Sequence, residues 1–218
     1  MCGICGFYGF EDKDLLKRMN NKLFHRGPNQ DGFYTDKNIS LAMRRLSIID
    51  LSEKGRQPHH NEDETIWVVF NGEIYNFQEI KETLIQRKHH FYSGTDTEVI
   101  VHAYEEWGFD CLKHFNGMFA FALWDSNKKL LFIARDRLGV KPLHYYWDNK
   151  KFLFSSEIKA ILEDSSIERE INTEALSEFL ALEYVPAPLT MFKNIYKLKP
   201  GHYLTLKKNT LTITQYWD

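Results

Sequence analysis

The sequence predicts an α+β domain in which strands, mostly joined as antiparallel hairpins, are more numerous than helices. Apolar and polar residues alternate in many short segments, and turn residues such as Asn and Gly separate these segments. Fewer segments repeat apolar residues at helical spacing. The 218 residues contain no repeat and no low-complexity segment, and we interpret residues 1–218 as one domain with a sizeable core.

Strands are predicted near both ends and through the middle of the chain. The stretches CGICGFYGF, SLAMRRLSIID and IWVVF are short and apolar, and three hairpins follow later, with Asn127 and Asn149 at two of the turns. The predicted strands and hairpins cover residues 2–10, 40–50, 66–70, 117–136, 142–156 and 201–217. The proline-rich stretch YVPAPLTMF is interpreted as a surface connection within the same domain.

Helices are predicted between these strands, where apolar residues follow a helical period. Asn76 with Glu79, and Thr95 with Glu98, have the spacing of a capping box, in which two residues satisfy each other's backbone N–H groups. Gly108 has the character of a helix end. The predicted helices lie around Leu15, Met19 and Leu23, and over residues 76–88, 96–108 and 173–184.

Composition excludes several classes of partner. Lys and Arg number 28 against 30 Asp and Glu, so no basic excess indicates nucleic acid or an anionic membrane as a partner. Charged residues at 11–14 interrupt any signal peptide, and no run of 18 apolar residues occurs. Three cysteines are too few for a disulfide framework. We therefore expect a soluble, cytoplasmic protein.

The N-terminal stretch MCGICG contains a C-x-x-C pair, which raises redox or metal chemistry as an alternative. Cys2 and Cys5 lie inside a predicted strand, whereas a thioredoxin-type pair follows a strand and begins a helix. A zinc site needs two more ligands, and the doublets at residues 59–60 and 89–90 (His-His) lack the usual gap between ligands. We expect no metal in this chain, and Cys5 is readily explained as a small buried residue.

Cys2 offers a different chemistry if Met1 is removed, which a small second residue generally favours. Cys2 then carries a thiol and an α-amine, and the pKa of such an amine is near 8. A neutral amine beside the thiol accepts its proton, so nucleophile and base occur in one residue. We therefore expect removal of Met1.

Other polar residues are candidates for binding a substrate. After IWVVF, the Asn71 side chain and the Gly72 backbone offer hydrogen-bond donors for an oxyanion, although Asn-Gly is also typical of a type I′ turn. Only one of Arg44 and Arg45 points into the fold, because neighbouring strand residues face opposite sides. Asp96 falls in the first turn of a predicted helix, where capping alone explains it.

A series of motifs along the chain resembles the glutaminase domain of glutamine-dependent asparagine synthetases, a branch of the class II glutamine amidotransferases. The motifs are MCGICGFYG, HRGPNQDG, RRLSIIDLS, NGEIYN, SGTDTEVI, NGMFAFALWD, RDRLGVKPLHYY, SSEIKAIL and PAPLTMFKNIYKLKPGHYL, which together cover essentially the whole chain. The resemblance implies the N-terminal-nucleophile hydrolase fold, a four-layer αββα sandwich of two antiparallel sheets between helices. It also implies hydrolysis of glutamine.

The resemblance implies a role for each matching residue. Cys2 is the implied nucleophile and base, with Asn71 and Gly72 as the oxyanion hole. Arg45 pairs with the α-carboxylate of glutamine, and Glu73 with Asp96 holds its α-ammonium group. Further residues that match the family pocket are Leu46, Ser47, Ile48 and Ile49, and residues with a supporting role are Arg26 and Gly27.

The chain departs from the family pattern in two places and ends early. Met43 stands where a histidine is frequent and Asn29 where an aspartate is usual, and neither position matches a catalytic role. In the family, a synthetase domain that uses ATP and Mg to make asparagine from aspartate follows the motif YWD. We expect no cofactor in this domain, and that missing domain, in the same polypeptide or a partner, to receive the ammonia. Another acceptor, a silent regulatory module and a homodimer are left open.

Overall fold

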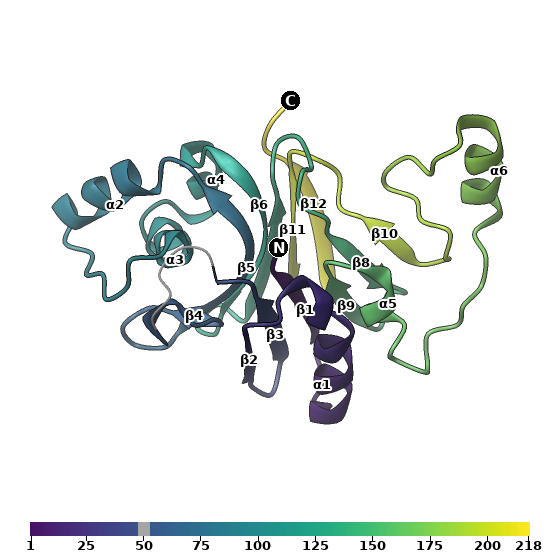
Figure 1. Ribbon diagram of the computed structural model, residues 1–218, viewed down its shortest axis with the longest axis horizontal. Coiled ribbons are helices and arrows are strands. Elements are labelled where there is room, and N and C mark those ends of the chain that lie inside the picture. The colour runs from purple at the N-terminus through teal and green to yellow at the C-terminus, as the bar shows by residue number, and fades with distance from the viewer. Residues whose placement is uncertain (48–52) are drawn as a thin grey trace.

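Two six-stranded antiparallel sheets form the centre of the computed structural model, which describes residues 1–47 and 53–218 (Figure 1). In the first sheet the order is β10 (Ile195–Lys197), β8 (His144–Trp147), β9 (Phe152–Ser155), β1 (Gly3–Tyr8), β3 (Ile39–Arg45) and β2 (Gln30–Thr35). In the second sheet it is β12 (Thr210–Gln215), β11 (His202–Lys207), β7 (Leu130–Arg135), β6 (Gly117–Asp125), β5 (Ile66–Ile74) and β4 (His59–His60).

Helices cover the outer face of each sheet (Figure 1). The α-helices are α1 (Lys13–Lys22), α2 (Phe77–Gln86), α3 (Asp96–Trp107), α4 (Cys111–His114), α5 (Ile158–Ile161) and α6 (Thr173–Leu182). Short 3₁₀ turns are η1 (Phe24–Arg26), η2 (Glu53–Gly55) and η3 (Gly108–Asp110).

The two-residue alternation of each strand separates the layers. On β1, Ile4 packs between the sheets, whereas Cys5 and Phe7 pack against the layer of α1 and α5. On β5, Val69 packs between the sheets, whereas Val68 packs against α2 and α3. Three apolar clusters therefore fill the spaces between four layers, which confirms the predicted αββα sandwich.

The helix α6 lies apart from these layers, at the end of the molecule opposite α2 (Figure 1). A single β-bridge between Ile171 and Phe192 closes the excursion that contains it. Ala175 is buried, but Leu180 and Leu182 are exposed. The proline-rich stretch at 184–192 connects α6 to β10 along the surface, as predicted.

The strand predicted at 66–70 is longer in the structure. β5 continues to Ile74, and Asn71 and Gly72 pair with Ala120 and Phe119 of β6. The alternative of a type I′ turn at Asn71-Gly72 is therefore wrong. The nine-residue β6 provides the partner that stabilises the extension.

The capping box predicted at Asn76 and Glu79 is also wrong. The Asn76 side chain makes no cap hydrogen bond; its Nδ2 donates to the His114 carbonyl and its Oδ1 accepts from the Asn116 N–H, both at 3.0 Å. Asn76 therefore joins the start of α2 to the segment after α4, because these backbone groups need partners.

The box predicted at Thr95 and Glu98 forms on one side only. Thr95 Oγ1 accepts from the Glu98 N–H at 3.4 Å, so Thr95 does cap α3. The Glu98 carboxylate does not return the bond and instead accepts from the N–H groups of Tyr92 and Ser93 at 2.8 Å. Glu98 thereby holds the segment before α3 against the helix.

The carboxylate of Asp136 organises the loop after β7. One oxygen accepts from the N–H groups of Leu138 and Val140 at 3.1 and 2.9 Å. The other accepts from Phe119 and Lys141 at 3.1 and 2.9 Å. Asp136 is 1% exposed, so its carboxylate relies on these four N–H donors in place of water.

We expect Asp136→Asn to lower the free energy of unfolding by about 2–4 kcal/mol, because its amide nitrogen would face two of these N–H donors. Urea unfolding measures the change, with Asp110→Asn at an exposed carboxylate as the control. A difference between the two variants of less than about 0.5 kcal/mol would contradict this account.

Candidate active site

A pocket opens at one end of the layer between the sheets. The start of β1, the end of β3, the second half of β5 and the first turn of α3 all reach it. Residues at these four places that line it and were singled out from the sequence are Cys2, Arg45, Leu46, Asn71, Gly72, Glu73 and Asp96. Segments far apart in the sequence therefore meet at one pocket.

Cys2 reaches this pocket because it directly precedes β1. It lies two residues before Ile4 and shares the inter-sheet face, whereas Cys5 points to the opposite face. The Cys2 thiol contacts the backbone of Leu46, accepting from its N–H at 3.4 Å and lying 3.7 Å from its carbonyl oxygen. The opposite facing of Cys2 and Cys5 excludes the redox-pair interpretation.

Burial raises the pKa of the Cys2 thiol, while the Leu46 N–H, the N-terminus and the Arg45 guanidinium oppose the rise. Burial also raises the pKa of the two fully buried thiols, Cys5 and Cys111, well above the ordinary range. Of the three free thiols, Cys2 is the one that is not fully buried.

Two residues that lie outside the pocket support the backbone around Cys2. Arg26 Nε donates to the Cys2 carbonyl at 2.9 Å, and its Nη1 donates to Glu157 at 2.9 Å. A Cβ on Gly27 would meet the Arg44 carbonyl oxygen at 2.3 Å, so only glycine allows η1 to approach β3 this closely. Neither Arg26 nor Gly27 lines the pocket, which agrees with supporting positions.

The edge of β5 beside the pocket carries three outward N–H groups. β4 pairs with β5 only at Val68 and Trp67, and no other described strand pairs with the edge beyond. The Phe70 N–H donates to Gln57 Oε1 at 2.7 Å, and the Ile74 N–H donates to Asp96 Oδ2 at 3.0 Å. Both flanking donors on this edge are therefore satisfied by side chains.

The Gly72 N–H lies between these two donors. Its partner across the sheet, Phe119, uses both its N–H and its carbonyl in bonds with Asp136, so the Gly72 N–H points away from β6. It thus faces the open edge of β5, where the pocket lies. A Cβ here would meet the Met118 carbonyl oxygen at 2.4 Å, so the position requires glycine.

The Asn71 side chain supplies a second donor on the inter-sheet side. Its residue is 1% exposed, and Nδ2 has no hydrogen-bond partner among residues 1–47 and 53–218. An unpaired buried amide donor costs about 1–3 kcal/mol, so such groups are rare without a purpose. Asn71 therefore brings an unused donor to a pocket that also contains the Cys2 thiol.

The two adjacent arginines of β3 face opposite sides, as the alternation predicts. Arg44 donates to Asn21 Oδ1 and to the Asn20 carbonyl on the α1 side. Arg45 is buried on the inter-sheet side, where its Nη1 donates to Gln30 Oε1 at 2.8 Å. Arg45 is therefore the one that lines the pocket.

Two carboxylates face the same pocket from β5 and α3. Glu73 lies two residues after Asn71 on the same strand face, and Asp96 is 5% exposed at the start of α3. Burial raises the pKa of Asp96 to about 6; the hydrogen bond from the Ile74 N–H opposes the rise and the Glu73 carboxylate adds to it. A ligand cation beside these groups would favour the ionised form of Asp96.

The structure also shows where the sequence reasoning was incomplete. Ser47 does not line the pocket; its N–H donates to Asn29 Oδ1 at 3.1 Å, so Asn29 holds the residues that directly follow β3. Met43 packs between the sheets. Ile48 and Ile49 lie outside the described residues. Lining residues that sequence reasoning missed include Gln57, Thr97, Met118 and Lys141.

Lys141 and Met118 belong to two of the family motifs quoted above, so the sequence could have indicated them. No motif contains Gln57, and its role depends on the edge of β5, which only the fold reveals. Its Nε2 donates to Thr97 Oγ1 at 3.1 Å, so it joins β5 to α3.

Comparison with known proteins identifies the family. Residues 1–217 match the glutamine amidotransferase domain family. The chain belongs to this family. A relative from Methanocaldococcus jannaschii, named as a glutamine-hydrolysing asparagine synthetase, is 42% identical over 100% of this chain and 47% of its own length. Asparagine synthetase [glutamine-hydrolyzing] 3 of Bacillus subtilis is 41% identical over 100% of this chain and 37% of its own length.

The fold of this amidotransferase domain agrees with a solved structure. Glutamine phosphoribosylpyrophosphate amidotransferase from B. subtilis superposes with a TM-score of 0.69 at 17% identity, covering 99% of this chain and 49% of that chain. The chain spans less than half the length of both curated relatives. In residues 1–47 and 53–218, no helix combines the length and apolar character needed to cross a bilayer.

The raised pKa of Asp96 predicts how stability depends on pH. The folded protein binds this proton more tightly than the unfolded chain, whose aspartate pKa is near 3.9. The contribution of Asp96 to stability is therefore fully present below about pH 4 and is lost as the pH rises to about 6.

We expect the unfolding free energy of the wild type, relative to Asp96→Asn, to fall by at most about 1.4 kcal/mol per pH unit across this window and then level off. Urea unfolding at a series of pH values measures the difference. A difference that stays constant from about pH 4 to about pH 7 would show that Asp96 has an ordinary pKa.

Proposed function

We propose that this amidotransferase domain hydrolyses glutamine to glutamate and ammonia through a thioester on Cys2. The observation that carries the proposal is the unpaired Nδ2 donor of Asn71, which lines the same pocket as the Cys2 thiol and the outward N–H of Gly72. A nucleophile next to two preorganised donors is the arrangement that acyl transfer requires. The names of the two relatives agree with glutamine as the substrate.

The charged residues of the pocket would orient the substrate. Arg45 offers a guanidinium to the α-carboxylate of glutamine, and Asp96 with Glu73 offers carboxylates to the α-ammonium group. These contacts hold the unreactive end of the substrate. The side-chain amide is then directed toward Cys2, Asn71 and Gly72, so binding energy is used for orientation.

The chemical steps use only groups of this chain and water. With Met1 removed, the Cys2 α-amine accepts the thiol proton while sulfur attacks the amide carbon, and the carbonyl oxygen becomes an oxyanion held by Asn71 and Gly72. Collapse of this intermediate breaks the C–N bond, and the α-ammonium gives its proton to the departing ammonia. Water, deprotonated by the same amine, then cleaves the thioester to glutamate and free thiol.

In a longer protein, we propose that the ammonia passes to a C-terminal synthetase domain that makes asparagine from aspartate with ATP and Mg. The relatives that carry this name are more than twice as long as the chain. Exposed apolar residues on the loop after β7, on and after α6 and near the C-terminus are candidates for contact with such a domain: Leu138, Val140, Leu180, Leu182, Tyr184 and Trp217. A reducing cytoplasm suits the free thiols, and another acceptor remains the alternative.

Paired substitutions test the roles of the two ends of the site. We expect Asn71→Ala to lower kcat by about 100-fold to 1,000-fold with little change in KM, because the lost donor acts on the transition state. Arg45→Ala should chiefly raise KM. Steady-state release of glutamate and ammonia measures both variants. Near-normal turnover in Asn71→Ala would exclude it as an oxyanion donor, and no hydrolysis by the wild type would refute the proposed function.

The N-terminus provides a separate test of the base. An amide nitrogen has no basic lone pair, so a chain that retains Met1 keeps the thiol and loses the base. We expect glutaminase activity to scale with the fraction of chains that begin at Cys2, as read by intact mass. Full turnover in a homogeneous sample that retains Met1 would require another residue as the base.

A further inference from the structure

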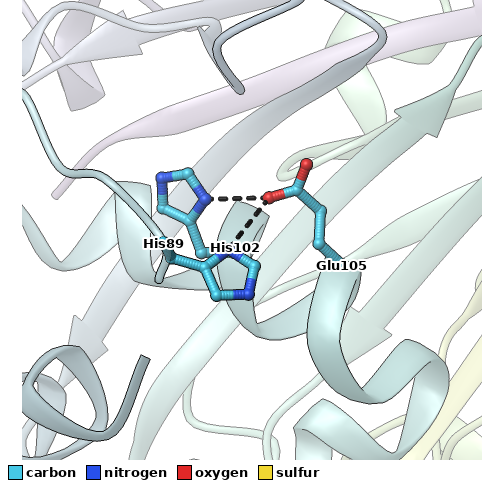
Figure 2. Close-up of side chains that lie close together, drawn as sticks. All are labelled: His89, His102 and Glu105. Carbon is cyan, nitrogen blue, oxygen red and sulfur yellow. Dashed lines mark hydrogen bonds and ion pairs between the residues drawn. The ribbon is translucent and has the colours of Figure 1, made fainter. Parts of the chain in front are cut away.

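A second cluster of ionisable side chains lies on the outer helical layer. His102 and Glu105 are one turn apart on α3, and His89 lies in the connection that follows α2. None of the three lines the pocket of Cys2. Figure 2 shows both imidazole rings beside one oxygen of the Glu105 carboxylate, which the two histidines share.

The spacing of the three side chains matches a small coordination site. Glu105 Oε2 lies 2.8 Å from His102 Nδ1 and 3.5 Å from His89 Nδ1. The three ligand atoms lie within 4.8 Å of one another. Ligands about 2.0–2.2 Å from a tetrahedral ion are separated by about 3.3–3.6 Å, so a shift of roughly an ångström completes the geometry.

The far side of the His89 ring carries a support that metal sites use, because His89 Nε2 lies 3.3 Å from Glu106 Oε2. His102 Nε2 has no hydrogen-bond partner among the described residues, and the Glu98 Oε1 atom that faces it lies 3.8 Å away. A carboxylate behind a ligating histidine fixes the tautomer and directs the other nitrogen to the metal. Glu105 has the same support, because its second oxygen accepts from Asn61 Nδ2 at 2.8 Å.

We propose that His89, His102 and Glu105 bind a divalent transition ion of the zinc class, with water as the fourth ligand. Two imidazoles and one carboxylate are a ligand set that zinc uses, whereas Mg²⁺ and Ca²⁺ prefer oxygen ligands alone. The open fourth position lies on the solvent side, because Glu105 is exposed and His89 is half-buried, while His102 is buried.

The charges around the site favour a cation. Glu98, Glu105 and Glu106 surround the two rings, and within the part of the chain that the structure describes the one arginine paired with these carboxylates is Arg87, on Glu106. Without an ion, the same carboxylates contact the two imidazoles directly. Metal ligation needs an unprotonated imidazole nitrogen, so binding is best measured at mildly alkaline pH.

An ion in this place would fasten the segment before α3 to the helix. His89 belongs to the connection between α2 and α3, and Glu98 already holds Tyr92 and Ser93 of that connection. The same helix begins with Asp96, which lines the pocket. The ion would therefore stabilise the helical layer that positions one wall of the pocket, independently of whether glutamine is hydrolysed.

The test uses Zn²⁺ and Co²⁺ with a Cys2→Ala protein, because an N-terminal aminothiol is itself a strong metal ligand. We expect one ion per chain by calorimetry, a visible Co²⁺ absorption typical of four-coordinate N and O ligands, and a higher Tm with Zn²⁺. His89→Ala and Glu105→Ala in this background, both near the surface, should weaken binding by at least about 100-fold. Glu106→Gln should weaken it by about 10-fold through the lost support.

His90→Ala is the matched control, because His90 is the exposed neighbour of His89 and lies outside the cluster. This variant should bind Zn²⁺ like the parent. Each variant is first shown to unfold at the same temperature as the parent without metal. Absence of saturable binding in the parent, or equal binding by His89→Ala, Glu105→Ala and His90→Ala, would overturn the proposal and leave the cluster as a set of ion pairs.

Discussion

The candidate site depends on the unequal pairing of β5. On one side β5 pairs with β6 along its full length, and on the other it pairs with β4 only near its beginning. β4 stops after two residues, so the backbone donors of β5 beyond that point need other partners. Gln57 and Asp96 accept from the N–H groups of Phe70 and Ile74, and the bond that Ile74 donates to Asp96 joins β5 to the first residue of α3. Gly72, between them, is left facing the pocket.

Strands and helices could be predicted well because the sequence clearly shows the two-residue alternation of strands and the 3.6-residue repeat of helices. Alternation predicted that Arg44 and Arg45 face opposite sides, which the structure confirms, whereas the four layers were implied by the family resemblance. The end of β5 was missed because Asn71 and Gly72 have low strand propensity, and their pairing with β6 is a tertiary effect. Local spacing predicted that the Asn76 side chain caps its own helix. The side chain instead bonds to the backbone of His114 and Asn116, which are distant in sequence.

The candidate site was predictable to a similar degree. Residues within recognisable motifs came together, and their catalytic roles stay predictions. Gln57 was invisible in the sequence because its partner is a strand edge. The cluster of His89, His102 and Glu105 was missed because its ligand spacing differs from that of zinc clips, and only the helix turn brings His102 and Glu105 together.

The pocket also explains why an empty site is electrostatically unfavourable. Asp96 and Glu73 lie close enough for the charge of one to oppose ionisation of the other, and burial removes the water that would screen them. A bound ammonium group would relieve that repulsion, so binding of a zwitterion would stabilise the domain as well as orient the ligand. The unpaired donor of Asn71 contributes in the same direction.

The partial burial of Cys2 affects how the protein withstands oxidants. Peroxides react with thiolates far faster than with thiols, and burial raises the pKa of Cys2 so that the resting sulfur keeps its proton. The two other sulfurs are sealed in apolar layers. Oxidative damage at cysteine should therefore be slow and confined to one atom, and its first product is a sulfenic acid, which is reversible.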